Sequence, residues 1–357
     1  MDMIHSMNND IYKSDYFYEL PEELIAKFPL EKRSDSKLLT VNNNDFEINI
    51  FSDVENKINK EDLLILNETK VFQARLELIK KTGGKIEILI LEKINKYTAN
   101  CLTRGLNRNI AHQKLFTDQY PLDIKILPTK DINFLKIEFS QPIDKICLNI
   151  GSMPIPPYLK RAHDKVDVDR YQSVFANKKY SNSVAAPTAS LHFDRTLLDR
   201  IKQKTHVSTL CLDVGYGTFQ PIKDDLIDAH ATLHKENFFI PDDLRTQIKS
   251  CKGRGGKIIA LGTTTLRALE SAFDPDKQDI RTGNQSTNIF IKEGYKFKIV
   301  DKLITNFHLP ESSLLMLVCA FGGKSNILNA YKYAIKNSLR FYSYGDAMII
   351  EKCLSKY

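Results

Sequence analysis

The sequence lacks the features that would mark a membrane or secreted protein. Its longest apolar run, Leu314 to Phe321, is far too short to cross a bilayer, which needs about 20 apolar residues. The segment Met1 to Asp10 is polar and has no apolar core of the kind a signal peptide needs. These absences predict a cytoplasmic protein with no membrane partner.

The sequence also lacks cysteine spacings typical of a disulfide framework or a zinc site. None of the six cysteines forms a CxxC pair, and no histidine stands beside one at ligand spacing. His230 and His234 could share one face of a helix, with Glu236 nearby, but no third metal ligand is evident. We therefore expect buried free thiols and no metal.

The composition is that of an ordinary globular protein. The chain has 357 residues, of which 42% are hydrophobic and 27% charged, enough for one large or two ordinary domains. Lysine and arginine number 51 against 44 acidic residues, a net charge of +7. This modest excess is compatible with a polyanionic partner such as nucleic acid but does not establish one.

The order of expected elements indicates two kinds of structure. Short strands separated by polar turns fill residues 71–144, a pattern typical of a small barrel, and the proline-rich segment Met153 to Pro157 ends this region. Strands and helices alternate in the second half, which favours an α/β layer. The predicted fold class is an α/β body with a mixed sheet, formed by 1–70 and 151–357, and a small β-barrel domain inserted at 71–150.

The expected elements are of two kinds. Strands are predicted at Leu38–Val41, Leu63–Leu66, Val71–Ile79, Lys85–Leu91, Tyr97–Leu102, Ile124–Leu127, Phe134–Phe139, Ser208–Leu212, Lys257–Leu261 and Phe297–Ile304. Helices are predicted at Pro21–Lys27, Thr265–Phe273 and Glu311–Phe321.

The segment Thr305 to Pro310 is the strongest candidate for a site. It follows a strand that ends at Ile304, and Pro310 or Glu311 would open the next helix. Ligands of α/β sheets bind beyond the carboxyl ends of strands. A helix N-terminus would keep His308 neutral and able to accept a proton. The alternative is a loop histidine that bonds only to the backbone.

Two glycine-containing turns follow other strands. Gly262, Thr263 and Thr264 open a helix whose free amides could hold a carboxylate, phosphate or ribose hydroxyl, although a threonine could instead simply cap the helix. Gly217 and Thr218 lie in a second turn. The full GxGxxG spacing is absent, so a conventional Rossmann methyltransferase is not supported.

Two further segments allow both a functional and a structural interpretation. Small residues from Ala185 onward precede His192, and such residues let a bulky ligand approach the backbone or let a tight loop pack on the core. The segment Arg340 to Met348 could stack on nucleic acid, or could form a buried C-terminal strand with a pair between Arg340 and Asp346.

Taken together, these segments resemble the S-adenosylmethionine:tRNA ribosyltransferase-isomerase family of queuosine biosynthesis, over roughly residues 15 to 350. The stretches that carry the resemblance are Leu20–Ala26, Glu31–Arg33, Asn67 with Thr69, Ala74–Arg75, Gly83–Glu87, Pro156–Tyr158, Arg170–Gln172, Ala185–Phe193, Gly217–Pro221, Gly262–Thr264, Thr305–Pro310 and Ser343–Met348.

The resemblance implies a reaction in which S-adenosylmethionine donates its ribosyl moiety rather than its methyl group. The acceptor would be 7-aminomethyl-7-deazaguanine at the wobble position of a tRNA with a GUN anticodon. The products would be epoxyqueuosine-tRNA, adenine and methionine. The resemblance also implies a small barrel inside an α/β body. S-adenosyl-L-methionine is then the co-substrate, and we expect a monomer that uses no metal.

Roles for individual residues follow from the resemblance and from residue chemistry. The predicted catalytic residues are His308, His192 and Asp346, the last as an orienting or charge-balancing carboxylate. Contact with the cofactor is predicted for Gly217, Thr218, Gly262, Thr263, Thr264 and Asn306. Contact with tRNA or with the methionine carboxylate is predicted for Arg33, Arg75, His234 and Arg340.

The sequence departs from the family pattern at three places. Asp213 stands where the family usually has histidine, and Ser190 replaces a usual glycine. His230 and His234 are separated by three residues, where the family's histidines are usually separated by two. These departures keep a catalytically retired tRNA-binding protein open as an alternative. A different S-adenosylmethionine enzyme, such as a methyltransferase, is the other alternative.

Overall fold

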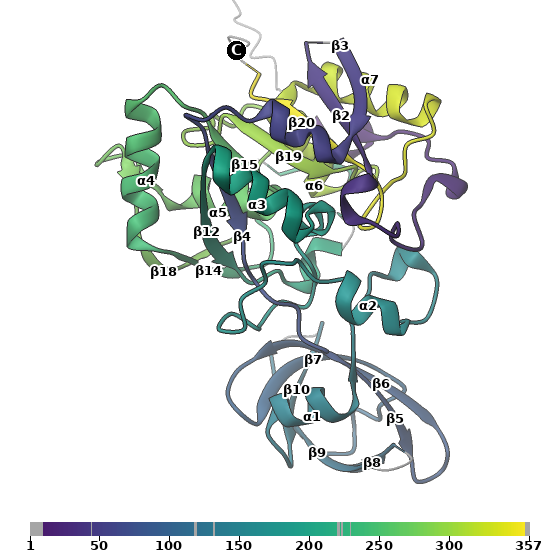
Figure 1. The fold of residues 1–357 in the computed structure, drawn as a ribbon. Coiled ribbons are helices and arrows are strands. Elements are labelled where there is room, and N and C mark those ends of the chain that lie inside the picture. The colour runs from purple at the N-terminus through teal and green to yellow at the C-terminus, as the bar shows by residue number, and fades with distance from the viewer. Residues whose placement is uncertain are drawn as a thin grey trace, which may run out of the picture.

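A large mixed sheet with helices on both faces forms the body of the molecule, and a small barrel lies at one end of it (Figure 1). The computed structural model describes residues 10–43, 45–117, 120–130, 133–219, 222, 224–228 and 230–353, and at Thr218 and Phe219 it describes the backbone alone. The segment Met1 to Asp10, apart from its last residue, lies outside these ranges.

Nine of the described strands form the large sheet. In spatial order they are β18 (Gly283–Thr287), β14 (Glu236–Ile240), β12 (His206–Leu212), β4 (Leu63–Asn67), β15 (Ile258–Leu261), β19 (Lys302–Asn306), β20 (Ala347–Glu351), β2 (Lys37–Asn42) and β3 (Asp45–Ile50). The four central strands β12, β4, β15 and β19 run parallel to one another. Their carboxyl ends therefore lie at one edge, the edge from which β4 leads into the barrel.

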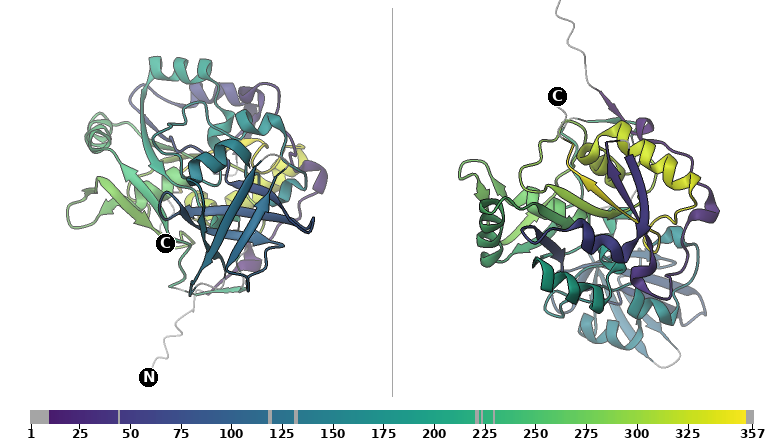
Figure 2. Two further views of the ribbon diagram at one scale, coloured as in Figure 1. Left: turned by 90° about the horizontal axis from the view of Figure 1, so that it is seen from below. Right: turned by 45° about the horizontal axis from the view of Figure 1, so that its top comes forward.

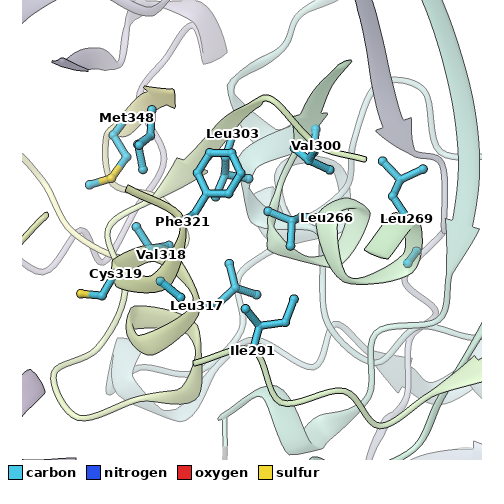
Figure 3. Close-up of a cluster of buried hydrophobic side chains, with 14 of the residues drawn as sticks. Leu266, Leu269, Ile291, Val300, Leu303, Leu317, Val318, Cys319, Phe321 and Met348 are labelled. Carbon is cyan, nitrogen blue, oxygen red and sulfur yellow. The ribbon is translucent and has the colours of Figure 1, made fainter. Parts of the chain in front are cut away.

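Alternating residues of the central strands face two separate cores, as strand geometry requires. In β4, Leu63 and Ile65 belong to one core while Leu64 and Leu66 belong to the other. The first core packs against helices α4 (Asp242–Gly253), α5 (Thr263–Ala272), α6 (Ser313–Gly322) and α7 (Lys324–Lys336). Figure 3 shows part of it, where side chains of α5, α6, β19 and β20 meet. The second core packs against α3 (Arg195–Lys204) and the 3-10 helix Phe51–Lys57.

The barrel is closed because the two strands at the ends of its spatial order pair with each other. The strands are β5 (Arg75–Lys80), β6 (Lys85–Lys93), β7 (Thr98–Arg104), β10 (Leu135–Phe139), β9 (Pro121–Leu127) and β8 (His112–Phe116), and β8 pairs with β5. All the pairings are antiparallel. The left view of Figure 2 looks at the barrel from below. An apolar cluster fills its interior, and α1 (Ile143–Ile150) contributes to that cluster.

Short elements complete the described chain. They are β1 (Ile11–Tyr12), which pairs with β13 (Leu226–Ile227), β11 (Gly151–Ser152), which pairs with β5, β16 (Phe273–Asp274), which pairs with β17 (Asp279–Ile280), α2 (Lys165–Arg170), and 3-10 helices at Lys13–Tyr16, Glu22–Leu24, Arg33–Asp35, Pro157–Leu159, Thr188–His192 and Tyr216–Phe219.

The structure confirms the predicted fold class, a mixed sheet with helices and a small antiparallel barrel. It corrects several element boundaries. The predicted helix Pro21–Lys27 is only a 3-10 turn at Glu22–Leu24. The predicted strand Phe297–Ile304 is wrong over its first half, because the backbone amides of residues 298–300 donate to the carboxylate of Glu270 rather than to a neighbouring strand.

The helix predicted at Glu311–Phe321 begins later than expected. Ser312 is its N-cap and accepts a hydrogen bond from the Leu315 amide at 3.2 Å, and α6 itself starts at Ser313. Glu311 has a left-handed backbone with φ of 56°, which no helix residue adopts. The loop after β19 is therefore longer than the sequence pattern predicts.

The six cysteines, all within the described residues, form no disulfide bond with one another, in agreement with the prediction. Five of the six are buried, and Cys353 is half-buried. Burial raises the pKa of the buried Cys147 thiol to about 12, so this thiol is not a reactive nucleophile near neutral pH. Among the helices that the structure describes, none combines the length and apolar character that crossing a membrane requires.

Candidate functional site

A cavity lies beyond the carboxyl ends of the central parallel strands, where α/β proteins usually bind their ligands. We call it the edge cavity. Its walls come from the end of β19 and the segments that follow β12, β15 and β19, together with three other segments. The lining residues are Tyr158, Ala186–Ala189, Val214, Gly262–Thr264, Thr305–Leu309, Ser312, Leu314 and Tyr342–Ser343.

The loop after β19 places His308 in the wall of the edge cavity. Its Nε2 lies 3.0 Å from the Thr305 hydroxyl, and its backbone amide donates to the Tyr331 hydroxyl at 2.9 Å. The Tyr18 hydroxyl donates to its carbonyl. Burial lowers the pKa of His308 to about 3. The predicted neutral state is therefore supported, but by desolvation rather than by the helix N-terminus, since α6 starts at Ser313.

The turn after β15 brings the N-terminus of α5 to the same cavity. Gly262 occupies the N-cap position with a left-handed φ of 89°, and no side chain caps the helix. The alternative that a threonine caps this helix is therefore wrong. Thr264 instead accepts a hydrogen bond from Asn67 Nδ2 at 3.4 Å. The first amides of α5 have no intrahelical acceptor, which suits a negatively charged or hydroxyl group.

Asn306, the last residue of β19, connects the edge cavity to His192. Its Nδ2 lies 2.9 Å from the Tyr342 carbonyl oxygen and 3.1 Å from His192 Nε2. The other ring nitrogen of His192, Nδ1, lies 2.7 Å from the Ser36 hydroxyl. The ring is stacked on Phe51, with 4.8 Å between the ring centroids. Both nitrogens of His192 are thus engaged with protein groups.

His192 does not line the edge cavity. It lines a smaller neighbouring cavity, together with Arg33 and Ser36. Burial, with the nearby Arg340 and Arg33 as smaller contributions, lowers the pKa of His192 to about 3. The predicted role of His192 in catalysis stays a prediction, and its geometry connects it to the cavity through Asn306.

Asp346 lies outside the edge cavity and bonds to the backbone. Its carboxylate accepts from the Lys37 amide at 2.8 Å and from the Arg340 amide at 2.7 Å. Burial raises the pKa of this carboxyl group, while the two amides act in the opposite direction. These bonds hold β20 and its approach against β2. The C-terminal strand is buried, as one of the two interpretations expected, but Asp346 bonds to the backbone amide of Arg340, whose guanidinium group donates to the Phe28 carbonyl. The role of Asp346 as an orienting carboxylate in catalysis stays a prediction.

Two of the predicted arginines, Arg33 and Arg340, donate hydrogen bonds to backbone carbonyl oxygens. Arg33 donates to the carbonyl oxygens of Asp169 at 2.8 Å and Leu191 at 3.3 Å. Arg340 donates to the carbonyl of Phe28, while its Nη1 is buried without a hydrogen-bond partner within the described structure. Both guanidinium groups therefore fix loops around His192, and a direct contact with tRNA stays a prediction for each.

Gly217 and His234 line a different cavity, between the body and the barrel. The two residues are in close contact, because a Cβ at Gly217 would lie 2.6 Å from His234 Cδ2. Asp213 lines the same cavity and accepts hydrogen bonds from Asn182 at 3.3 Å and Thr69 at 3.4 Å. Val214 lines both this cavity and the edge cavity, so the two are neighbours. The side chain of Thr218 lies outside the described structure.

Arg75 is the predicted contact residue that belongs to the barrel. It forms an ion pair with Glu87 on the neighbouring strand and lines a cavity that also contains Arg104 and Arg161. The structure therefore distributes the predicted tRNA contacts over several surfaces rather than one patch.

The other family departures have simple structural consequences. Ser190 is fully buried in the 3-10 turn Thr188–His192 and does not have a positive φ, so the position does not demand glycine. His230 and His234 lie in a non-helical segment, so the helical face considered for them is wrong. Within the described ranges, no three His, Cys, Asp or Glu residues are grouped as metal ligands.

Sequence reasoning missed the aromatic wall of the edge cavity and the partner of His192. Tyr158 and Tyr342 line the cavity, and their ring centroids lie 4.8 Å apart. Ser36 reaches His192 from a distant part of the chain. Nothing in the local sequence around Ser36 indicates this contact, which only the tertiary structure creates.

Comparisons with known proteins agree with this arrangement over nearly the whole chain. The family model described as queuosine biosynthesis protein matches residues 13–350. The chain belongs to this family, that of the S-adenosylmethionine:tRNA ribosyltransferase-isomerases. The family expected from the sequence motifs is thereby confirmed, and with it the classification of the chain as an enzyme.

Individual relatives match at full length. The S-adenosylmethionine:tRNA ribosyltransferase-isomerase of Acinetobacter baumannii is 46% identical, over 95% of this chain and 98% of its own. The protein of the same name from Nitrosomonas europaea is 40% identical, over 98% of both chains. The crystal structure of an S-adenosylmethionine tRNA ribosyltransferase from Thermotoga maritima is 30% identical, with a TM-score of 0.53, and covers 94% of this chain and 100% of its own.

Proposed function

We propose that the protein transfers and isomerises the ribosyl moiety of S-adenosylmethionine onto 7-aminomethyl-7-deazaguanine at the wobble position of a tRNA with a GUN anticodon. The products are epoxyqueuosine-tRNA, adenine and methionine. The observation that carries this proposal is the edge cavity, where the Gly262 turn, Asn306 and His308 meet in a chain that belongs to this enzyme family.

The reaction must rebuild the sugar as a cyclopentane as well as attach the aminomethyl nitrogen. A base removes a proton from the carbon next to the sulfonium, which the positive sulfur makes acidic. The electron pair left there forms a double bond to the adjacent ring carbon as the bond from that carbon to the ring oxygen breaks; the ring oxygen becomes an aldehyde oxygen, the bond to adenine breaks, and adenine leaves with a proton. The amine nitrogen then adds to the former ring carbon of the double bond and loses a proton, and the carbon next to sulfur bonds to the aldehyde carbon. The resulting alkoxide closes the epoxide by displacing methionine, whose sulfur takes the carbon–sulfur electron pair.

His308 is the group we assign to proton transfer. It lies in the cavity wall and is neutral at physiological pH, so Nδ1 or Nε2 can accept a proton. Its low pKa makes it a weak base in the empty site. A bound sulfonium would not correct this, since like charges repel, so the acidity of the substrate carbon has to provide the driving force.

The cofactor contacts are assigned to the turn at the start of α5 and to Asn306. Free amides of Thr263 and Thr264 offer donors to a carboxylate or ribose hydroxyl. Gly217 lines the neighbouring cavity between body and barrel, to which we assign the tRNA base, and Thr218 follows it in the sequence. We assign His234 and Arg75 to tRNA contact there and on the barrel, and Arg33 and Arg340 to the loops around His192.

The decisive experiment follows the released products. The protein is incubated with S-adenosylmethionine and tRNA that carries the deazaguanine precursor, and the mixture is separated by chromatography. Adenine and methionine should appear in equal amounts, and only when the modified tRNA is present. S-adenosylhomocysteine as the main product would instead indicate methyl transfer, and binding of tRNA without either product would indicate a retired enzyme.

Binding of tRNA should weaken as salt concentration rises, because each lysine or arginine that contacts a phosphate displaces counterions. The net charge of +7 motivates this expectation. A titration at several salt concentrations measures the slope, and a flat dependence would mean that phosphate contacts contribute little. We further propose that the enzyme acts in the cytoplasm as a monomer, which size-exclusion chromatography with light scattering tests.

A further inference from the structure

The side-chain amide of Asn306 is oriented unambiguously by its surroundings. The carbonyl oxygen of Tyr342 can only accept, so the amide atom 2.9 Å from it must be the nitrogen. Asn306 Oδ1 therefore points away from Tyr342, and it has no hydrogen-bond partner within the described structure although the residue is only 1% exposed. Asn306 lines the edge cavity. A buried acceptor without a partner is costly and indicates that a ligand supplies the donor.

The same orientation determines the proton position on His192. Asn306 Nδ2 donates to His192 Nε2 at 3.1 Å, so Nε2 must be the unprotonated nitrogen. Nδ1 then carries the hydrogen and donates to the Ser36 hydroxyl at 2.7 Å. Ser36 in turn donates to the carbonyl of Arg33 at 3.3 Å. A chain of four groups thus runs from the N-terminal segment to the amide of Asn306.

We propose that Asn306 Oδ1 accepts a hydrogen bond from an N–H or O–H group of the bound S-adenosylmethionine, and that His192 is a positioning residue that holds Asn306 in this orientation. The inference rests on the proposed function. It departs from the direct catalytic role that the sequence suggests for His192.

Three observations favour positioning over proton transfer by His192. Both ring nitrogens are engaged, and the ring is stacked on Phe51 and 3% exposed. The residue lines the smaller cavity rather than the edge cavity. A proton taken up at Nε2 would also place a donor against the donor Asn306 Nδ2, which would break the contact and release the amide.

A matched pair of substitutions separates the two roles. The amide of glutamine reaches about as far as Nε2, so His192→Gln keeps an acceptor for Asn306. The amide of asparagine reaches only about as far as Nδ1, so His192→Asn loses that acceptor. If His192 positions Asn306, His192→Asn should weaken binding of S-adenosylmethionine about tenfold, as loss of one oriented hydrogen bond implies, while His192→Gln stays within about threefold of the parent.

Asn306→Ala should weaken binding by at least as much as His192→Asn. In the double variant, the second substitution should add little, because His192 acts through Asn306. Ser190→Ala is the control, since this hydroxyl lies in the same 3-10 turn, is buried and has no partner within the described structure. It should bind S-adenosylmethionine like the parent. Calorimetry measures affinity and a thermal melt checks folding of each variant.

The other results would overturn the proposal. Equal loss of single-turnover rate in His192→Gln and His192→Asn, with unchanged affinity, would make His192 the base. Additive effects in the double variant would separate His192 from Asn306. If His192→Asn does not fold, Ser36→Ala is tested in its place, because it removes the acceptor of the His192 Nδ1 proton. Ser36→Ala should weaken binding of S-adenosylmethionine about threefold. Parental affinity in this variant would contradict the proposed chain of hydrogen bonds.

The donor on the ligand is the adenine amino group, a ribose hydroxyl or the ammonium group of the methionine part, and competitors that each lack one of these groups distinguish them. These are the 6-oxo, 2′-deoxy, 3′-deoxy and deamino analogues of S-adenosylhomocysteine. The parent should discriminate against one of them, and Asn306→Ala should lose that discrimination; discrimination that persists in the variant would refute the acceptor role. If the parent protein binds no S-adenosylmethionine at all, the proposed function fails; if it binds but the variants match it, the inference alone fails.

Discussion

The edge cavity and the barrel interior differ in their side chains: the barrel core is apolar, whereas the wall of the edge cavity combines apolar and polar residues. The barrel core is a cluster of apolar residues, such as Leu76, Ile88 and Ile137. The wall of the edge cavity includes buried Asn306 and His308. Buried polar groups cost free energy unless they find partners, and a fold has no reason to collect them in one place. The difference teaches that polarity beyond the carboxyl ends of the strands serves a ligand, whereas the barrel core serves stability.

The largest expected effect is on turnover and concerns the edge cavity. His308→Gln keeps size and polarity but cannot act as an acid or base, so the single-turnover rate should fall about a hundredfold to ten-thousandfold. Cofactor affinity and melting temperature should change little. The measurement is quench-flow on modified tRNA, with calorimetry on the same sample. A folded variant with a parental rate would remove His308 from proton transfer.

The opposite pattern is expected in the barrel. Ile137→Ala deletes buried methyl and methylene groups from a fully buried position, so the free energy of unfolding should fall by about 2–5 kcal/mol. Turnover per folded molecule should stay within about twofold of the parent. Urea unfolding and an active-site titration measure the two quantities. A variant that unfolds normally but loses activity would show that the barrel core takes part in chemistry, which would break the comparison.

The pH dependence of stability should separate the two regions as well. Burial lowers the pKa of His192 and His308 from 6.5 to about 3, so between these values the unfolded chain binds more protons. Stability is therefore fully present above pH 6.5 and is lost as the pH falls toward 3, by about 1.4 kcal/mol per pH unit for each histidine.

His308→Gln should reduce the change in the free energy of unfolding per pH unit by the contribution of one histidine. Ile137→Ala removes no titratable group and should leave this pH dependence unchanged. Urea unfolding at several values between pH 5 and 6.5 gives the slopes. Parallel curves for His308→Gln and the parent would mean that His308 is protonated in the folded protein at these pH values.

A smaller effect is expected at the start of α5. Gly262 has a φ of 89° and a ψ of 152°, a backbone region that glycine adopts almost alone and that costs residues with a Cβ about 1–3 kcal/mol. A Cβ there would meet Thr264 Oγ1 at 3.6 Å and the Ala189 Cβ at 3.7 Å, which are ordinary contacts. Gly262→Ala should therefore fold with a stability loss of that size and shift the first amides of the helix.

Gly262→Ala should bind S-adenosylmethionine more weakly than the parent. The loss of stability does not account for this weaker binding, because the variant stays folded under the assay conditions. Gly255→Ala is a matched control, because that glycine also has a positive φ, of 77°, with nothing close to the added Cβ. Equal cofactor affinities in the two variants would show that the α5 turn does not contact the cofactor.

Much of the architecture followed from local patterns. Short apolar runs predicted central strands such as Leu63–Leu66, which are buried on both faces, and the strand-rich texture of residues 71–144 predicted the barrel. The pattern failed where a distant group competed. The apolar run before β19 reads as strand, yet Glu270 takes its amides. No local signal announces a carboxylate from another helix.

By itself, the sequence determined which residue types stand after each strand, and so predicted a site at the carboxyl edge that includes Asn306 and His308. Only the tertiary structure decided which of the predicted residues line the edge cavity and which lie elsewhere. It set Gly217 and His234 in another cavity, gave Asp346 to two backbone amides, and placed His192 behind Asn306. The physical reason is that a hydrogen bond depends on distance and direction within a few tenths of an ångström. Residue order constrains composition at a strand end, but the direction of each side chain depends on partners such as Ser36 that packing brings together.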